Sequence, residues 1–152
     1  MKRSLMFVLF LVVVFLVVPQ VAAADTVSAP ARLSHTVVTG GDPALAKVNV
    51  HAKFSSVDRV CFDFTFVNDL LDPGEFLRIT PLQLFPSLTG PGFENVGSTP
   101  MAERTLCLDS AFGYSNVNAL FADGKDKNLE IGMQVGSVEI ASLVVTVTGT
   151  PA

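Results

Sequence analysis

A strict alternation of apolar and polar residues constrains the fold of this chain more than any other feature. It is clearest from Arg59 to Val67, where Val60, Phe62, Phe64 and Phe66 fall on one face and Arg59, Cys61, Asp63 and Thr65 on the other. A period of two is typical of a β-strand with one buried side. Phenylalanines repeated on one face predict a stripe of hydrophobic core, and the competing interpretation is an exposed aromatic binding strip.

Three other segments show the same period. From Ala46 to Phe54 the apolar members are Val48, Val50, Ala52 and Phe54, and the polar members are Lys47, Asn49, His51 and Lys53. Leu129, Ile131, Met133 and Val135 alternate after a polar turn. In the last strand, Val138 to Thr148, the apolar phase shifts, which predicts a β-bulge near Ala141-Ser142.

Turn-forming residues separate these segments. Asp72-Pro73-Gly74 marks a break, and a long connection from Phe85 to Pro100 is rich in Pro and Gly. A further strand is expected from Phe76 to Leu84, with an edge or a bend at Pro81, and another from Arg104 to Leu108. Val117 to Phe121 fits a short helical turn or a strand. The predicted fold is all-β, an antiparallel two-sheet sandwich or jelly roll of about seven to eight short strands.

The first 24 residues have the layout of a cleavable signal peptide. Lys2 and Arg3 precede an unbroken apolar run from Leu5 to Val18, and Pro19 leads into small residues ending at Ala24. The alternative is a retained membrane anchor, because this stretch is long enough to reach across a bilayer. Cleavage leaves residues 25–152, a length typical of one domain with its own core.

Charge bears on the kind of partner. The chain has 10 basic and 14 acidic residues, and loss of Lys2 and Arg3 with the signal leaves 8 basic residues and a net charge of −6. Binding to nucleic acid or to anionic lipid requires clustered Lys and Arg, which the chain lacks. We therefore expect no nucleic-acid partner, and membrane contact only if the signal is uncleaved.

Cys61 and Cys107 are the only cysteines in the chain. Secretion would place them where thiols oxidise and disulfides persist, so we predict that they form one disulfide bond. A zinc site would need more ligands at closer spacing. We expect no metal and no cofactor.

Candidates for catalysis are few. The chain has two histidines, His35 and His51, and neither lies in a recognisable motif of nucleophilic or metal-dependent enzymes. Paired carboxylates can act alone in sugar hydrolysis, but the acidic residues are scattered through turns. We expect no catalytic residues and no enzymatic activity.

Acidic turns are weak candidates for calcium binding. Asp123, Asp126, Asn128 and Glu130 place four oxygen-bearing side chains close together, although the spacing differs from that of an EF-hand loop. The alternative is a solvated hairpin turn. A second acidic loop, formed by Asp69, Asp72 and Glu75, has the same ambiguity.

Four aromatic residues lie in predicted loops: Phe85, Phe93, Phe112 and Tyr114. They are candidates for a small apolar contact surface at one end of the sandwich. Equally, loop aromatics can plug the end of the core.

The stretch from Leu120 through the Asp123-Gly124 turn to Gly149 resembles the closing strand pair of β-sandwich modules in secreted bacterial proteins. That resemblance implies fold and location only. Together these features predict a non-enzymatic protein, secreted or periplasmic or on the cell surface, with a structural or surface-interaction role toward a protein or surface partner. The alternatives are a small carbohydrate- or calcium-binding module that uses its end loops and, third, a secreted hydrolase.

Overall fold

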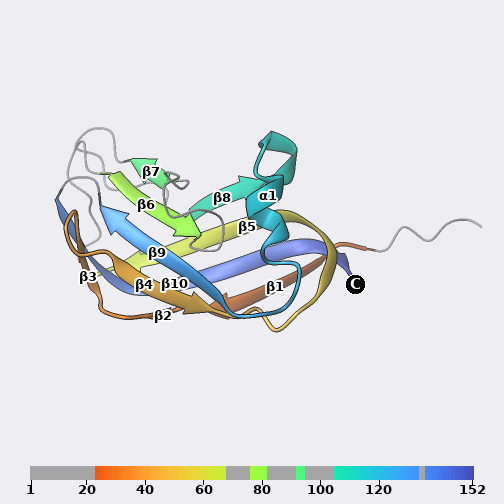
Figure 1. Ribbon diagram of the computed structural model, residues 1–152, viewed down its shortest axis with the longest axis horizontal. Helices are drawn as coiled ribbons and strands as arrows, with labels where there is room; N and C mark the ends of the chain where they lie inside the picture. Colours follow the sequence, from red (N-terminus) through yellow and green to blue (C-terminus); the bar gives the residue numbers. More distant parts are fainter. Residues whose placement is uncertain (1–22, 68–75, 82–91, 95–104, 134–135) are drawn as a thin grey trace, which may run out of the picture.

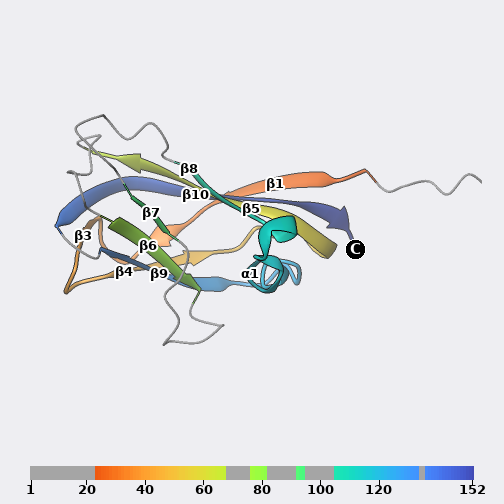
Figure 2. The same cartoon turned by 90° about the horizontal axis from the view of Figure 1, so that it is seen from above.

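The computed structural model describes residues 23–67, 76–81, 92–94, 105–133 and 136–152. These residues form two antiparallel sheets packed face to face, which confirms the predicted all-β sandwich (Figure 1, Figure 2). The residues 1–22 of the predicted signal lie outside the described part. No helix among the described residues is long and apolar enough to cross a membrane.

The first sheet has the order β1-β10-β5-β8, with β3 beside the start of β10. Its strands are β1 (Asp25–Pro30), β3 (Val37–Thr39), β5 (Phe54–Phe66), β8 (Thr105–Asp109) and β10 (Ser137–Pro151). The second sheet has the order β2-β4-β9-β6-β7. Its strands are β2 (Arg32–Leu33), β4 (Ala44–Val48), β6 (Phe76–Pro81), β7 (Gly92–Glu94) and β9 (Lys127–Met133).

Two short helical elements interrupt the strands between β8 and β9: η1 (Ser110–Phe112) and α1 (Ser115–Ala119). The helical alternative for the region around Val117 is therefore correct. The described residues form ten strands rather than seven or eight. The difference arises because β2, β3 and β7 are only two or three residues long, too short to show a period in the sequence.

The core lies between the paired strands β5 and β10 and the second sheet. Val60, Phe62, Phe64 and Phe66 of β5 are all buried, so the phenylalanine stripe is core and not an exposed strip. Opposite them on the same sheet, Leu143, Val145 and Val147 of β10 are completely buried. The ring of Phe62 meets that of Phe121 edge to face at 6.2 Å, which closes the core below α1.

The predicted bulge in the last strand is confirmed. The pairing of β10 with β5 shifts register between Ile140 and Ser142, so Val138 and Ile140 stay buried together with Leu143 despite the change of phase. A second shift follows Thr148, where Gly149 passes so close to β5 that a side chain there would overlap the Ser56 carbonyl.

The predicted strand from Ala46 to Phe54 is wrong in its second half. Strand β4 ends at Val48, and β5 begins at Phe54. Between them the Asn49 side chain accepts a hydrogen bond from the His51 N–H at 2.8 Å, and His51 takes a φ of 53°. An Asn side chain that bonds the backbone two residues on forms a turn, which here reverses the chain. Val50 is nonetheless buried, so the alternation predicted burial correctly although the strand is not continuous.

Two other predicted strands are present. Strand β6 includes Pro81, which pairs with Leu129 of β9, and residues 82–84 of the expected strand lie outside the described part, so the predicted edge or bend at Pro81 stays a prediction. The expected strand over Arg104 to Leu108 is β8, which extends to Asp109, and Arg104 lies outside the described residues. Most of the long connection from Phe85 to Pro100 also lies outside the described residues.

Candidate functional site

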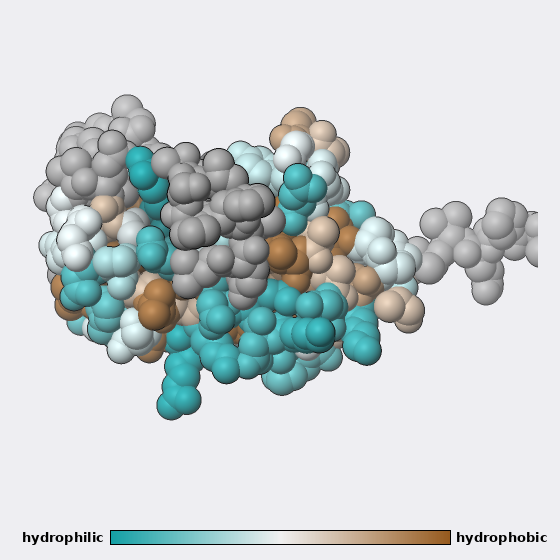
Figure 3. Space-filling model, in the orientation of Figure 1, coloured by the Kyte–Doolittle hydropathy of each residue, from teal (hydrophilic) through white to brown (hydrophobic). Residues whose placement is uncertain are grey.

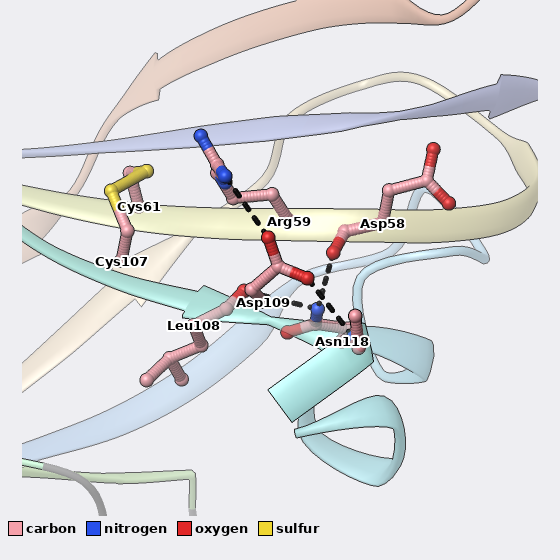
Figure 4. Close-up of polar contacts among 8 residues, drawn as sticks. Asp58, Arg59, Cys61, Cys107, Leu108, Asp109 and Asn118 are labelled. Atoms are coloured by element: carbon pink, nitrogen blue, oxygen red, sulfur yellow. Dashed lines mark hydrogen bonds and ion pairs between the residues drawn. A yellow bond between two sulfur atoms is a disulfide. The ribbon is translucent and has the colours of Figure 1, made fainter. Parts of the chain in front are cut away.

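Chemically distinctive side chains gather at the edge of the first sheet, where β8 pairs with β5 (Figure 4). Three residue pairs face each other across these strands on the outer surface. Arg59 faces Asp109, Cys61 faces Cys107, and Asp63 faces Thr105. One pair is ionic, one covalent and one hydrogen-bonded, so every outer position of β8 is fastened to β5.

The disulfide between Cys61 and Cys107 is present, as predicted. The cysteines lie directly opposite each other with Cα atoms 4.0 Å apart, the close approach of a pair that exchanges no backbone hydrogen bonds. Both alternate with core residues and so point outward: Cys107 is exposed and Cys61 is half-buried. The bond closes a sequence separation of 46 residues, for which loop entropy gives about 4 kcal/mol of stability.

Asp109 joins the strand to the segment that follows it. One carboxylate oxygen accepts a hydrogen bond from Arg59 Nη2 at 3.0 Å. The other accepts one from the Ala111 N–H at 3.0 Å, which caps η1. The hydrogen bond from Arg59, followed by the one from Ala111, holds the pKa of Asp109 below its ordinary value.

Asn118 of α1 is completely buried beside the end of β8. Its Nδ2 donates to the carbonyl oxygens of Asp58 at 3.2 Å and of Leu108 at 3.1 Å (Figure 4). After Asp109 the chain leaves the sheet, so no strand residue of β8 faces Asp58. The Asn118 amide supplies the donor that β8 no longer offers, and α1 is thereby fixed to the sheet edge.

Residues 110–114, which we call the aromatic knob, project from this anchored base. Phe112 is 82% exposed and Tyr114 is 38% exposed. Gly113 adopts a φ of 97° and ends η1, turning the chain between the two aromatic residues. The projection formed by η1 and the start of α1 carries apolar surface (Figure 1, Figure 3). These two aromatics therefore do not plug the end of the core.

The other two aromatic candidates are Phe85 and Phe93. Phe85 lies outside the described residues. Phe93 was expected in a loop, but it belongs to β7, where it pairs with Leu77 in the second sheet. Its predicted place in a loop is wrong, because a short strand forms inside the Pro- and Gly-rich connection.

Lysine side chains are paired with two of the four calcium candidates. The Asp123 carboxylate contacts Lys127 Nζ at 2.6 Å, and Lys127 is buried on the core side of β9. Asp126 contacts Lys47 Nζ at 2.6 Å and accepts a hydrogen bond from Asn49. These contacts, with those from Lys127 and Lys47 as the largest influence on each, lower the pKa values of both carboxyls.

Asn128 and Glu130 alternate with Lys127 on β9 and so lie on its outer face. Within the described part of the chain, no group of three or more acidic, His or Cys side chains is placed to hold a metal ion. The loop with Asp69, Asp72 and Glu75 lies outside the described residues.

The histidines occupy turns. His35 lies between β2 and β3, where its Nδ1 is 3.0 Å from Ser34 Oγ and its Nε2 is 3.8 Å from Asp42. This Ser-His-Asp order suggests a nucleophile, but Ser34 Oγ also accepts the Leu45 N–H, while the Ser34 N–H donates to the Leu45 carbonyl. The hydroxyl thus completes the β2–β4 ladder. His51 is exposed in the turn before β5.

Sequence reasoning identified the cysteines and the two knob aromatics but missed Arg59, Asp109 and Asn118. Asp109 precedes Ser110 and Ala111 in a pattern that fits a helix cap, which was the one available signal. Comparisons of the chain with protein-family models, with curated proteins and with solved structures find no match.

Proposed function

We propose that this chain is a non-enzymatic interaction domain, acting outside the cytoplasm, that binds a protein partner through its aromatic knob. The observation that carries the proposal is the exposure of Phe112, at 82%, on a segment anchored at both ends. Covering a large aromatic ring that is otherwise held in water lowers the free energy, and this favours binding of a partner.

Anchoring matters because a mobile aromatic would lose conformational entropy on binding. Asp109 caps the first turn of the knob, and Asn118 fixes the helix that follows it. The disulfide holds β8, from which the knob emerges. Preorganised aromatic anchors of this kind dominate the binding energy of many protein interfaces.

Charge indicates the complementary chemistry. Asp58 is exposed beside the base of the knob, and the chain after residue 24 carries a net charge of −6. A partner with an apolar pocket for Phe112 and basic residues around its rim fits this surface. Opposite charges at a rim raise the association rate and disfavour partners of like charge.

The extracytoplasmic location rests on two features. The first 24 residues have the composition of a cleavable signal. A disulfide with an exposed cysteine is compatible with an oxidising compartment. Mass spectrometry of the mature protein tests the proposed cleavage, with an N-terminus at Asp25 expected and an intact Met1 contradicting it.

Binding is tested with the purified, oxidised chain as bait against envelope and culture fractions of its own source. A captured protein is then purified and titrated by calorimetry. Phe112→Ser is expected to weaken its binding about 30-fold, as loss of a hot-spot aromatic does. Val37→Ser is the matched control, because Val37 is 49% exposed on β3 at the opposite end of the molecule. Equal binding by both variants, or failure to find a partner that depends on Phe112, would overturn the proposal.

The second candidate is carbohydrate binding, favoured by Tyr114, whose ring is partly exposed and carries a polar edge beside Phe112. A glycan array separates the two functions. A sugar whose binding is abolished by Tyr114→Ala would replace a protein as the partner, whereas a blank array favours the protein.

A further inference from the structure

The disulfide lies on the solvent side of its sheet and not in the core. Cys61 lies between Val60 and Phe62, and Cys107 precedes Leu108; these three neighbours are buried, so both cysteines face outward. Cys107 is exposed. A thiolate in solution can therefore approach Cys107 without unfolding of the core. Exposed disulfides are the ones most readily reduced.

Apart from its five-residue pairing with β5, the strand that this bond retains has few attachments among the described residues. Within the described part of the chain, β8 pairs with β5 alone, and Leu108 is its only buried residue. The Arg59–Asp109 and Asp63–Thr105 contacts join exposed or half-buried groups. Such contacts are weak in water compared with a covalent cross-link.

Loss of the cross-link would reach the aromatic knob through Asp109 and Asn118. Asp109 is the last residue of β8, the partner of Arg59 and the cap of η1. When β8 separates from β5, Asp109 loses Arg59, and the Asn118 amide can no longer donate to both the Asp58 carbonyl of β5 and the Leu108 carbonyl of β8. Phe112 and Tyr114 are then no longer held in fixed positions relative to the sheet.

We propose that Cys61–Cys107 is a redox-sensitive clip that controls the aromatic knob, an inference that rests on the proposed function of that knob. The reductant is a dithiol, such as the active site of a thiol oxidoreductase. Its thiolate attacks Cys107 Sγ, the disulfide bond breaks, and Cys61 leaves as a thiolate that takes up a proton. The second thiol of the reductant then displaces Cys107, leaving two cysteine thiols and one oxidised dithiol.

Access is tested first by treating the folded chain with dithiothreitol and counting alkylated thiols by mass spectrometry over time. Reduction in native buffer is expected at a rate within about tenfold of the rate in denaturant, because Cys107 is exposed. Native reduction slower by several orders of magnitude would mean that the bond opens only on global unfolding, which would overturn the proposal.

Release of the knob is tested by hydrogen exchange of the oxidised and reduced chains. In the reduced chain, residues 105–119 are expected to exchange by local opening at least about tenfold faster than residues 143–148 of β10, whose exchange follows global unfolding. Equal exchange in the two regions of the reduced chain, or the same difference between them in the oxidised chain, would contradict the proposal. Thr105→Val is the matched control, because it removes an outer contact of β8 while keeping the disulfide, and its oxidised form should exchange like the unmodified chain.

Hydrogen exchange does not depend on any partner, so the clip and the proposed function fail separately. Release of residues 105–119 without any partner that depends on Phe112 would overturn the binding function and leave the clip. Partner binding that needs Phe112 and is unchanged by reduction would overturn the clip's control of binding.

Discussion

Strand β5 has a neighbour on each side, and the two neighbours are held by different physics. On one side β10 pairs with β5 from Ile140 to Pro151, and Leu143, Val145 and Val147 bury their side chains completely. On the other side β8 pairs over five residues, of which Leu108 alone is buried. Apolar burial fixes the first pairing, and specific outer-face contacts fix the second.

The difference shows where a small sandwich has room for function. Any loosening of β10 would expose the core, so its attachment cannot vary without loss of the fold. Strand β8 contributes little to the core, and its attachment through a disulfide, an ion pair and a hydrogen bond is open to change by redox state or pH. The exposed aromatics extend from this adjustable side.

The largest expected effect on stability comes from removal of a buried side chain of the core. Phe62→Ala should lower the free energy of unfolding by about 3–5 kcal/mol, because it leaves a cavity beside Phe121. The same substitution at Phe112 should change it by less than about 0.5 kcal/mol, since that ring is exposed. Urea denaturation measures both. Equal losses would show that the ring of Phe112 contributes as much to stability as a ring of the core.

Removal of the covalent fastening comes next. The double variant Cys61→Ser, Cys107→Ser should lose up to about 4 kcal/mol of stability, because the unfolded chain is no longer cross-linked. The melting temperature of the oxidised protein, compared with that of the double variant and of the reduced protein, measures the loss. Unchanged melting on reduction would show that the bond does not stabilise the domain.

A smaller effect is expected at the junction of β8 with α1. Asn118→Ala removes the donors to the Asp58 and Leu108 carbonyls. It should lower the free energy of unfolding by about 1–2 kcal/mol. The cost lies toward the low end of the usual range because Asn118 Oδ1, which is buried without a partner among the described residues, is removed as well. Hydrogen exchange should rise more in residues 110–119 than in β10. A uniform rise across both would place Asn118 in the common core.

Acid should produce the smallest effect, and at the β8 side. The pKa of Asp109 is lowered, chiefly by its hydrogen bond from Arg59, so the carboxylate adds stability above the ordinary aspartate pKa of about 3.9. That contribution is lost as pH falls below about 4 and Asp109 becomes protonated. Asp109→Asn should therefore flatten part of the fall in melting temperature between about pH 5 and pH 2.

The same sign applies to Asp123 and Asp126, whose pKa values are lowered chiefly by hydrogen bonds from Lys127 and Lys47. They lie at the turn before β9, away from β8, so Asp126→Asn serves as a control. It should flatten the acid response of the melting temperature without changing hydrogen exchange in the aromatic knob. A change of exchange in the knob would link two regions that share no described contact.

Much of the core was predictable because burial with a period of two can be recognised within a few neighbouring residues. The faces of β5 and the bulge at Ala141-Ser142 follow from neighbouring residues alone. The strand predicted through His51 was wrong, because buried alternation continues through a turn that Asn49 makes with its own side chain. The short strands β2, β3 and β7 exist only because a partner strand lies beside them.

The sequence by itself determined the fold class and the cysteine pairing, because alternation specifies one buried face and two cysteines permit one disulfide. The alternation also placed Cys61 on the polar face of its strand. Only the tertiary structure decided that Cys107 is exposed beside it, that Arg59 meets Asp109, and that Asn118 completes the sheet edge. These contacts join residues separated by up to 60 positions, apart from the local one between Asn118 and Leu108. Their geometry depends on the register of β8 with β5, which no local pattern of residues contains.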